Sequence, residues 1–121
     1  MPYKLEWKRN GVIKRYSGVV TFDDVINSER ELTGNSSFGS LRFVISDYIG
    51  SEPPRLKPEQ ACDVRALRIG GFSTNPHIKF AFITQDAITK AAILESVAAG
   101  EVLHTFRIFE TYEQAAAWVG L

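Results

Sequence analysis

The 121-residue sequence lacks the features that mark several specialised classes of protein. Its single cysteine, Cys62, excludes an internal disulfide. Lysine plus arginine and aspartate plus glutamate number 14 each, so no net charge attracts nucleic acid or an anionic membrane. No run approaches the roughly 18 apolar residues of a membrane span, and residues 1–10 are charged where a signal peptide is apolar. We expect a soluble, cytoplasmic protein without a nucleic-acid partner.

Motifs for metals, cofactors and catalysis are also missing. The two histidines, His77 and His104, have no nearby cysteine and no paired carboxylate, so we expect neither to bind a metal. The glycines form neither GxGxxG nor a P-loop, so nothing indicates a nucleotide. Cys62 has no histidine close in sequence, and we expect a small, partly buried residue rather than a nucleophile. The sequence therefore predicts no cofactor.

The apolar pattern predicts five strands. Residues 3–8 alternate apolar and charged, and Asn10-Gly11 predicts a type I′ turn into a second strand over residues 12–19, near a sheet edge. Residues 41–49 and 77–84 carry consecutive apolar side chains, which is typical of strands buried on both faces of a mostly parallel sheet. The last strand is expected over residues 104–109.

Each of four predicted helices begins at a capping residue or an N-terminal proline: Thr21, Pro58, Asp86 and Thr111, the last in a capping box with Gln114. The first helix ends at Gly34, and the third runs to about Ala99 before Gly100. In the third helix we expect four residues to face the sheet: Ile88, Ala91, Ala92 and Ala98. The order β-β-α-β-α-β-α-β-α predicts a single α/β domain over residues 1–121 with a mixed, mostly parallel five-stranded sheet.

Crossover helices between adjacent parallel strands lie on one face of the sheet and leave the other face partly bare. Apolar residues on that bare face need a cover. We therefore expect a homodimer, in contact through aromatic residues of the first hairpin or through a second apolar side of the third helix, where Ile93 and Val97 lie well round the helix from Ile88.

Two short motifs carry a resemblance. The ending Phe109–Val119, FETYEQAAAWV, and the helix start Thr21-Phe22-Asp23-Asp24 are similar to those of small, stand-alone bacterial STAS-like proteins. The order of elements over nearly the whole chain resembles the STAS domain, named for sulfate transporters and anti-sigma-factor antagonists. This resemblance implies a STAS-like fold and a regulatory or binding role. Regulatory STAS proteins are phosphorylated on a serine in an Asp-Ser-Ser/Thr-Gly motif, and the corresponding residues 46–54 lack it, so the resemblance implies no phosphoswitch here.

The carboxyl ends of the two buried strands should meet at one edge of the sheet, where open α/β folds bind ligands. Six polar residues follow these strands: Ser46, Asp47, Tyr48, Ser51, Thr84 and Asp86. They predict a site for a protein partner or for a small apolar or anionic ligand. The alternative is that the serines and Asp47 only bond the loop backbone and that Asp86 only caps a helix.

A second candidate is a basic surface on the following loop and helix, made by Arg55, Lys57, Arg65 and Arg68. It suits an acidic partner or a phosphorylated ligand, but acidic residues are interleaved with it, and a solvated mixed-charge surface is the alternative.

We therefore expect a non-catalytic binding or regulatory domain, with an enzyme or a purely structural homodimer as alternatives. A binding domain predicts a pocket near Asp47 and Asp86 without paired titrating groups. An enzyme predicts a deep cleft there with two mutually perturbed ionisable residues.

Overall fold

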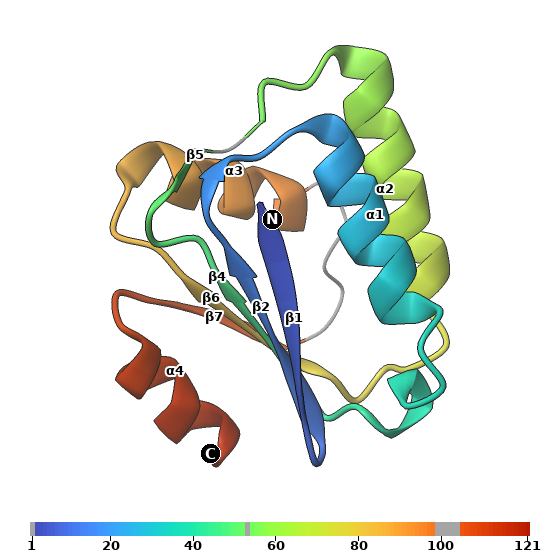
Figure 1. Cartoon of the computed structure of the whole chain (residues 1–121), viewed down its shortest axis with the longest axis vertical. Helices are drawn as coiled ribbons and strands as arrows, with labels where there is room; N and C mark the ends of the chain where they lie inside the picture. The colour runs from blue at the N-terminus through green and yellow to red at the C-terminus, as the bar shows by residue number, and fades with distance from the viewer. Residues whose placement is uncertain (1, 53, 99–104) are drawn as a thin grey trace.

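The computed structural model describes residues 2–52, 54–98 and 105–121. Its main sheet has the strand order β1-β2-β4-β6-β7 (Figure 1). The first pair is antiparallel, and all other neighbours are parallel. The strands are β1 (Tyr3–Lys8), β2 (Gly11–Tyr16), β4 (Phe43–Asp47), β6 (Lys79–Ile83) and β7 (Phe106–Phe109). The predicted single α/β domain with an N-terminal hairpin and a mostly parallel five-stranded sheet is confirmed.

Four α-helices cover the sheet on both faces (Figure 1). They are α1 (Phe22–Thr33), α2 (Pro58–Phe72), α3 (Ala87–Ala98) and α4 (Tyr112–Val119), with a short 3₁₀ helix, η1, at Phe38–Ser40. The three crossover helices share one core cluster through Leu32, Phe72 and Ile93. By contrast, α4 packs Ala115 into a second cluster on the opposite face. The face expected to be bare is thus covered by α4.

The predicted caps are confirmed at three helix starts. The hydroxyl oxygen of Thr21 accepts a hydrogen bond from the backbone N–H of Asp24 at 3.2 Å. A carboxylate oxygen of Asp86 accepts from the N–H of Thr89 at 2.9 Å, and Thr111 accepts from the N–H of Gln114 at 3.3 Å. The predicted stop at residues 99–100 and strand start at residue 104 lie outside the described residues.

The first hairpin forms, but not through a type I′ turn. Lys8 pairs with Gly11, so the loop residues are Arg9 and Asn10, and no described residue other than glycine has a positive φ. Gly11 itself has no positive φ. It lies opposite Phe43 on β4, and a side chain at position 11 would collide with that aromatic ring. Glycine is therefore needed here for close packing rather than for turn geometry.

The second strand is shorter than predicted, because Gly18 has a φ of 63° and breaks it. The chain continues as β3 (Gly18–Val19), which pairs in parallel with β5 (Ser51–Glu52) in a small second sheet that the sequence did not predict. Strand β2 does not form the edge of the main sheet, because it lies between β1 and β4, and its Lys14 is only 3% exposed.

Helix α3 presents a different side to the sheet from the one predicted. Thr89 and Ile93 are its buried residues, whereas Ile88 is 75% exposed. Ala91 and Ala98, also predicted to face the sheet, are exposed, whereas Ala92 is exposed but lines the cavity between α3 and the sheet. An alanine-rich helix offers several apolar sides, and the side that turns inward packs Ile93 into the core cluster with Leu32 and Phe72. Cys62, predicted to be partly buried, is likewise exposed.

Two further predictions concern chain-wide features. Among the described residues, no helix is long and apolar enough to cross a membrane. The predicted burial of the strand within residues 41–49 on both faces is confirmed, because β4 lies between β2 and β6 and residues Phe43 to Ser46 are all buried.

Replacing Ile45 with alanine tests this core. Its side chain is 0% exposed, so the cavity left by truncation should lower the free energy of unfolding by about 2–5 kcal/mol in urea denaturation. The matched control is Ile49→Ala in the loop after β4, at a residue that is 44% exposed, where the change should stay within about 0.5 kcal/mol. Equal effects at the two positions would contradict the burial pattern.

Candidate functional site

A cavity of about 190 Å³ lies between the sheet and the helices α1, α2 and α3. Its floor comes from β2, β4 and β6, and its walls come from the three helices and from the residues after β4. Most of the wall is apolar, with side chains such as Val25, Val64, Phe82 and Ile93. An apolar cavity of about 150 Å³ accepts a benzene-sized molecule, so this cavity has room for a small organic ligand.

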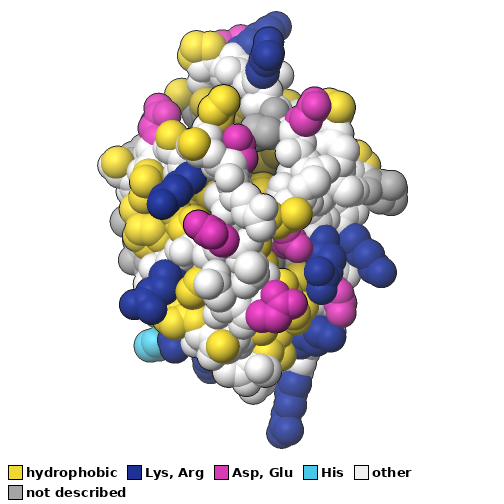
Figure 2. Space-filling model, turned by 90° about the vertical axis from the view of Figure 1, so that its left-hand side faces the viewer, with side chains coloured by type: hydrophobic (Ala, Val, Ile, Leu, Met, Phe, Trp, Pro, Cys, Tyr) yellow, Lys and Arg dark blue, Asp and Glu magenta, His cyan; other side chains and the backbone are white. Residues whose placement is uncertain are grey.

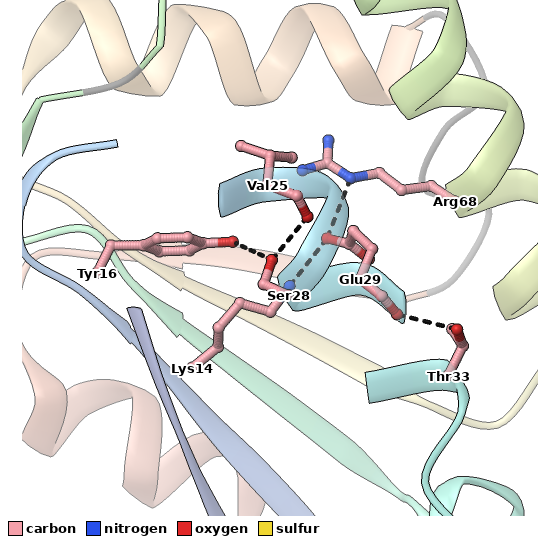
Figure 3. Close-up of polar contacts among 7 residues, drawn as sticks. All are labelled: Lys14, Tyr16, Val25, Ser28, Glu29, Thr33 and Arg68. Carbon is pink, nitrogen blue, oxygen red and sulfur yellow. Dashed lines mark hydrogen bonds and ion pairs between the residues drawn. The ribbon is translucent and has the colours of Figure 1, made fainter. Parts of the chain in front are cut away.

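Three charged side chains from different elements meet in the wall of this cavity (Figure 3). Lys14 of β2 donates to Glu29 Oε1 of α1 at 2.8 Å, and the side chains are 4% and 3% exposed. The Nε of Arg68, on α2, donates to the same oxygen at 3.3 Å. We call Lys14, Glu29 and Arg68 the charged cluster. It carries two positive charges and one negative charge.

The apolar stripe of α1 explains why Glu29 points inward. The buried residues of this helix are Val25, Ser28, Glu29 and Leu32, which share one helix face. Ser28 donates to the carbonyl of Val25 at 2.8 Å and lies 3.3 Å from the Tyr16 hydroxyl (Figure 3). A polar layer therefore joins α1 to β2 inside an otherwise apolar interface.

The pKa values of Glu29 and Lys14 shift in opposite directions, that of Glu29 downward and that of Lys14 upward. Burial alone raises the pKa of Glu29, but the charges of Lys14 and Arg68 lower it further, so the net pKa is below its usual value. Burial alone lowers the pKa of Lys14, yet the Glu29 carboxylate raises it to a net value above the usual one. A general acid or base works best with a pKa near neutrality. The cavity does contain two mutually perturbed groups, but both shifts hold them charged and make them poor proton-transfer groups.

The second carboxylate oxygen of Glu29 is unpartnered. Within the part of the chain that the structure describes, Glu29 Oε2 is the one buried side-chain nitrogen or oxygen atom without a hydrogen-bond partner. Leaving a buried acceptor unsatisfied costs about 1–3 kcal/mol, more for a charged group. An unpaired atom of this kind beside a cavity is expected where a ligand or a bound water supplies the missing donor.

Tyr48 forms part of the cavity wall just beyond the carboxyl end of β4. Its ring stacks on that of Tyr16 with centroids 5.0 Å apart and an angle of 4° between the planes. Burial raises the pKa of the Tyr48 hydroxyl to about 12, so this side chain is neutral at physiological pH.

The structure brings together three of the six predicted site residues. Ser46, Tyr48 and Ser51 all line the cavity. Asp47 does not. One of its oxygens accepts from the N–H of Ile49 at 2.9 Å, and the other lies 3.7 Å from Arg15.

Thr84 and Asp86 also lie outside the cavity lining. The hydroxyl of Thr84 accepts from the N–H of Asp86 at 3.1 Å. Hydrogen bonds from the Thr89 side chain and backbone lower the pKa of Asp86, in keeping with its place at the start of α3. Their contacts are those of a strand end and a helix cap.

The four residues of the predicted basic surface differ in their exposure. Arg68 lies in the charged cluster, Arg65 is half-buried, and Arg55 and Lys57 are exposed. On the face shown in Figure 2, basic and acidic side chains are interspersed with hydrophobic ones. His77 is exposed, and no group of three potential metal ligands occurs in the described part of the chain. His104 lies outside the described residues.

Lys14 and Glu29 were missed by sequence reasoning. One feature of α1 could have indicated the buried Glu29. Ser28 and Glu29 fall on the same helical stripe as Val25 and Leu32. A carboxylate on an apolar stripe calls for a buried partner. The sequence does not say which cation supplies it.

The comparison with solved structures identifies the fold. An uncharacterised protein of the DUF3478 family from Shewanella loihica PV-4, described as having a SpoIIAA-like fold, matches with a TM-score of 0.66 and 18% identity over 97% of this chain and 91% of that one. The unphosphorylated anti-sigma-factor antagonist SpoIIAA matches with a TM-score of 0.67 and 12% identity, over 98% and 97% of the two chains. The phosphorylated form of the Bacillus cell-fate determinant SpoIIAA matches with a TM-score of 0.66 and 13% identity, over 97% and 98%.

At these identities the likeness shows the fold alone. The chain has the SpoIIAA-like, or STAS, fold that its sequence predicted. No family model matches the sequence, and no curated protein is similar to it.

Replacing Glu29 with glutamine tests the charged cluster. Removing one partner of a buried ion pair should lower the free energy of unfolding by about 3–5 kcal/mol at pH 7. Because the pKa of Glu29 is lowered by folding, its contribution is present above the usual value of 4.5 and is lost as the pH falls through the folded value. The difference between wild type and variant, measured by urea denaturation, should therefore shrink below pH 4.5.

The control for this variant is Glu31→Gln on the same helix, where the glutamate is exposed. Its effect on stability should be within about 0.5 kcal/mol. A Glu29→Gln effect as small as that of the control would show that the buried pair contributes nothing to folding.

Proposed function

We propose that this protein is a non-catalytic binding domain whose cavity holds a small, largely apolar molecule. The observation that carries the proposal is the cavity itself, about 190 Å³ in volume and lined by side chains from the sheet and three helices. Small-molecule sites in proteins are typically concave and apolar, with a few polar groups that orient the ligand. Here the polar groups are Ser46, Tyr48 and the charged cluster.

The position of the cavity supports the same proposal. It reaches the carboxyl end of β4, where Ser46, Tyr48 and Ser51 contribute to its wall. Ligands of open α/β sheets bind at this end of the strands. The shift directions of Lys14 and Glu29 favour binding over acid–base catalysis, because both groups remain charged near neutral pH.

A binding role also suits the fold in general terms. SpoIIAA, which shares the fold, is described as an anti-sigma-factor antagonist, so this architecture can present a surface to another protein. We propose that occupancy of the cavity and contact with a protein partner are compatible in this domain, because the outer sides of α1 and α2 are not needed to line the cavity.

Filling the cavity tests the proposal. Val64 is 3% exposed and lines the cavity from α2, so Val64→Phe should occupy part of the space and weaken binding of ethylbenzene by about tenfold or more. Binding is measured by titration with amide chemical shifts as the readout. Val19→Phe makes the same change at a residue that is 67% exposed and should leave the affinity unchanged. Equal affinity in both variants, or no binding to wild type, would contradict the proposal.

A second proposal is that the domain forms a homodimer through the outer side of α3. This side exposes Ile88 and Leu94, with exposures of 75% and 45%, among several alanines. Apolar side chains gathered on one helix side are typical of a contact surface.

Light scattering tests the dimer. Wild type should have twice the mass of one chain, and Ile88→Glu should have the mass of one chain with the same far-ultraviolet circular dichroism spectrum as wild type, because the change removes the contact and not the fold. A wild-type mass equal to one chain at high concentration would contradict this proposal and leave the cavity proposal unaffected.

A further inference from the structure

We infer that the molecule in the cavity carries a hydroxyl or similar neutral group that both donates and accepts hydrogen bonds, and that this group binds between Glu29 and Lys14. The inference rests on the proposed function and specifies the chemistry of the ligand. Its basis is the set of hydrogen bonds that the charged cluster leaves unmade within the described residues.

Glu29 Oε2 can accept a hydrogen bond from a donor group on the ligand. This oxygen is buried, belongs to a residue in the cavity wall and accepts no hydrogen bond from any described group. The pKa of Glu29 is lowered, so the group is a carboxylate and can only accept. A ligand that offers only acceptor atoms leaves it unsatisfied.

The Lys14 ammonium can donate a hydrogen bond to an acceptor atom on the ligand. An ammonium group has three N–H donors, and among the described residues one hydrogen bond is formed, to Glu29 Oε1. The ring of Tyr16 lies 5.8 Å from Nζ and stabilises the charge without accepting a conventional hydrogen bond. A ligand atom with a lone pair therefore has a donor available at the same place where its hydrogen can reach Glu29.

The charge of the cluster excludes the simpler head groups. An ammonium head group between Glu29 and Lys14 lies beside the Lys14 ammonium and is disfavoured by repulsion. A carboxylate would be attracted by Lys14 but would bring its oxygens against Glu29 Oε2 and leave that atom without a donor. A hydroxyl meets both requirements and adds no charge to a buried site.

The volume limits the apolar part of the ligand. About 190 Å³ is somewhat more than the space occupied by a benzene-sized guest. The class indicated is thus a small aromatic or alicyclic alcohol, with its ring against the apolar wall. A single bound water also satisfies Glu29 Oε2, and in that case a ligand hydroxyl gains no affinity.

Four probes separate these cases: ethylbenzene, benzyl alcohol and benzylammonium, which have nearly equal shape, and benzyl methyl ether, which is one methyl group larger than the alcohol. They are titrated into the wild-type protein at pH 7 with amide shifts as the readout. Benzyl alcohol should bind about tenfold more tightly than ethylbenzene, because it adds hydrogen bonds to charged groups. Benzyl methyl ether accepts but does not donate, and should bind no more tightly than ethylbenzene. Benzylammonium should bind least tightly.

The outcomes distinguish a failure of the inference about the ligand's hydroxyl from a failure of the proposed function. If ethylbenzene and benzyl alcohol bind equally, or the ether matches the alcohol, the donor–acceptor inference is wrong although the cavity binds ligands. If no probe binds, or Val64→Phe leaves binding of ethylbenzene unchanged, the proposed function itself is wrong.

A matched pair of variants locates the hydroxyl. Glu29→Gln should remove most of the preference for benzyl alcohol over ethylbenzene, while Glu31→Gln on the exposed side of α1 retains it. Circular dichroism first establishes that Glu29→Gln is folded. If it is not, Lys14→Gln is titrated instead and should likewise reduce the preference. A preference that survives in the folded variant places the hydroxyl elsewhere and overturns the inference.

Discussion

The structure depends on one carboxylate oxygen. Glu29 Oε1 accepts from Lys14 and from Arg68, so the second strand and the first two helices are all held to a single atom. Two buried charges remain stable only if each stays beside a partner, because separating them leaves an uncompensated charge away from water. These contacts join α1 and α2 to β2 beside the apolar clusters, and they place charged groups at a cavity that is largely apolar.

Most of the fold was predictable because its signals are local. Consecutive apolar residues in β4 and β6 indicated burial on both faces, and short capping patterns at Thr21, Asp86 and Thr111 gave the helix starts. The wrong predictions concern places where two local structures have similar energies. Helix α3 has more than one apolar side, and the predicted second strand of the hairpin contains a glycine that permits a break. Tertiary packing decides such cases, and it leaves no local trace in the sequence.

The sequence predicted where the candidate site lies, but it did not predict which residues form it. The carboxyl end of β4 is part of the cavity, as the parallel sheet implied. Successive residues of a strand point to opposite faces, however. Ser46 therefore lines the cavity while Asp47 interacts with the loop and with Arg15. Lys14 and Glu29 are 15 residues apart in different elements, so no spacing rule pairs them, and only their common burial reveals the cluster.

The placement of α4 has a consequence for how the domain can diversify. Its cluster, around Ala115 and Ile45, and the cavity are on opposite faces of the sheet, so their side chains share few neighbours. Effects of substitutions at sites without shared partners usually add. Selection can therefore reshape the cavity for a new ligand while the layer under α4 continues to supply an independent share of folding stability. A scaffold divided in this way tolerates change in one compartment without compensation in the other.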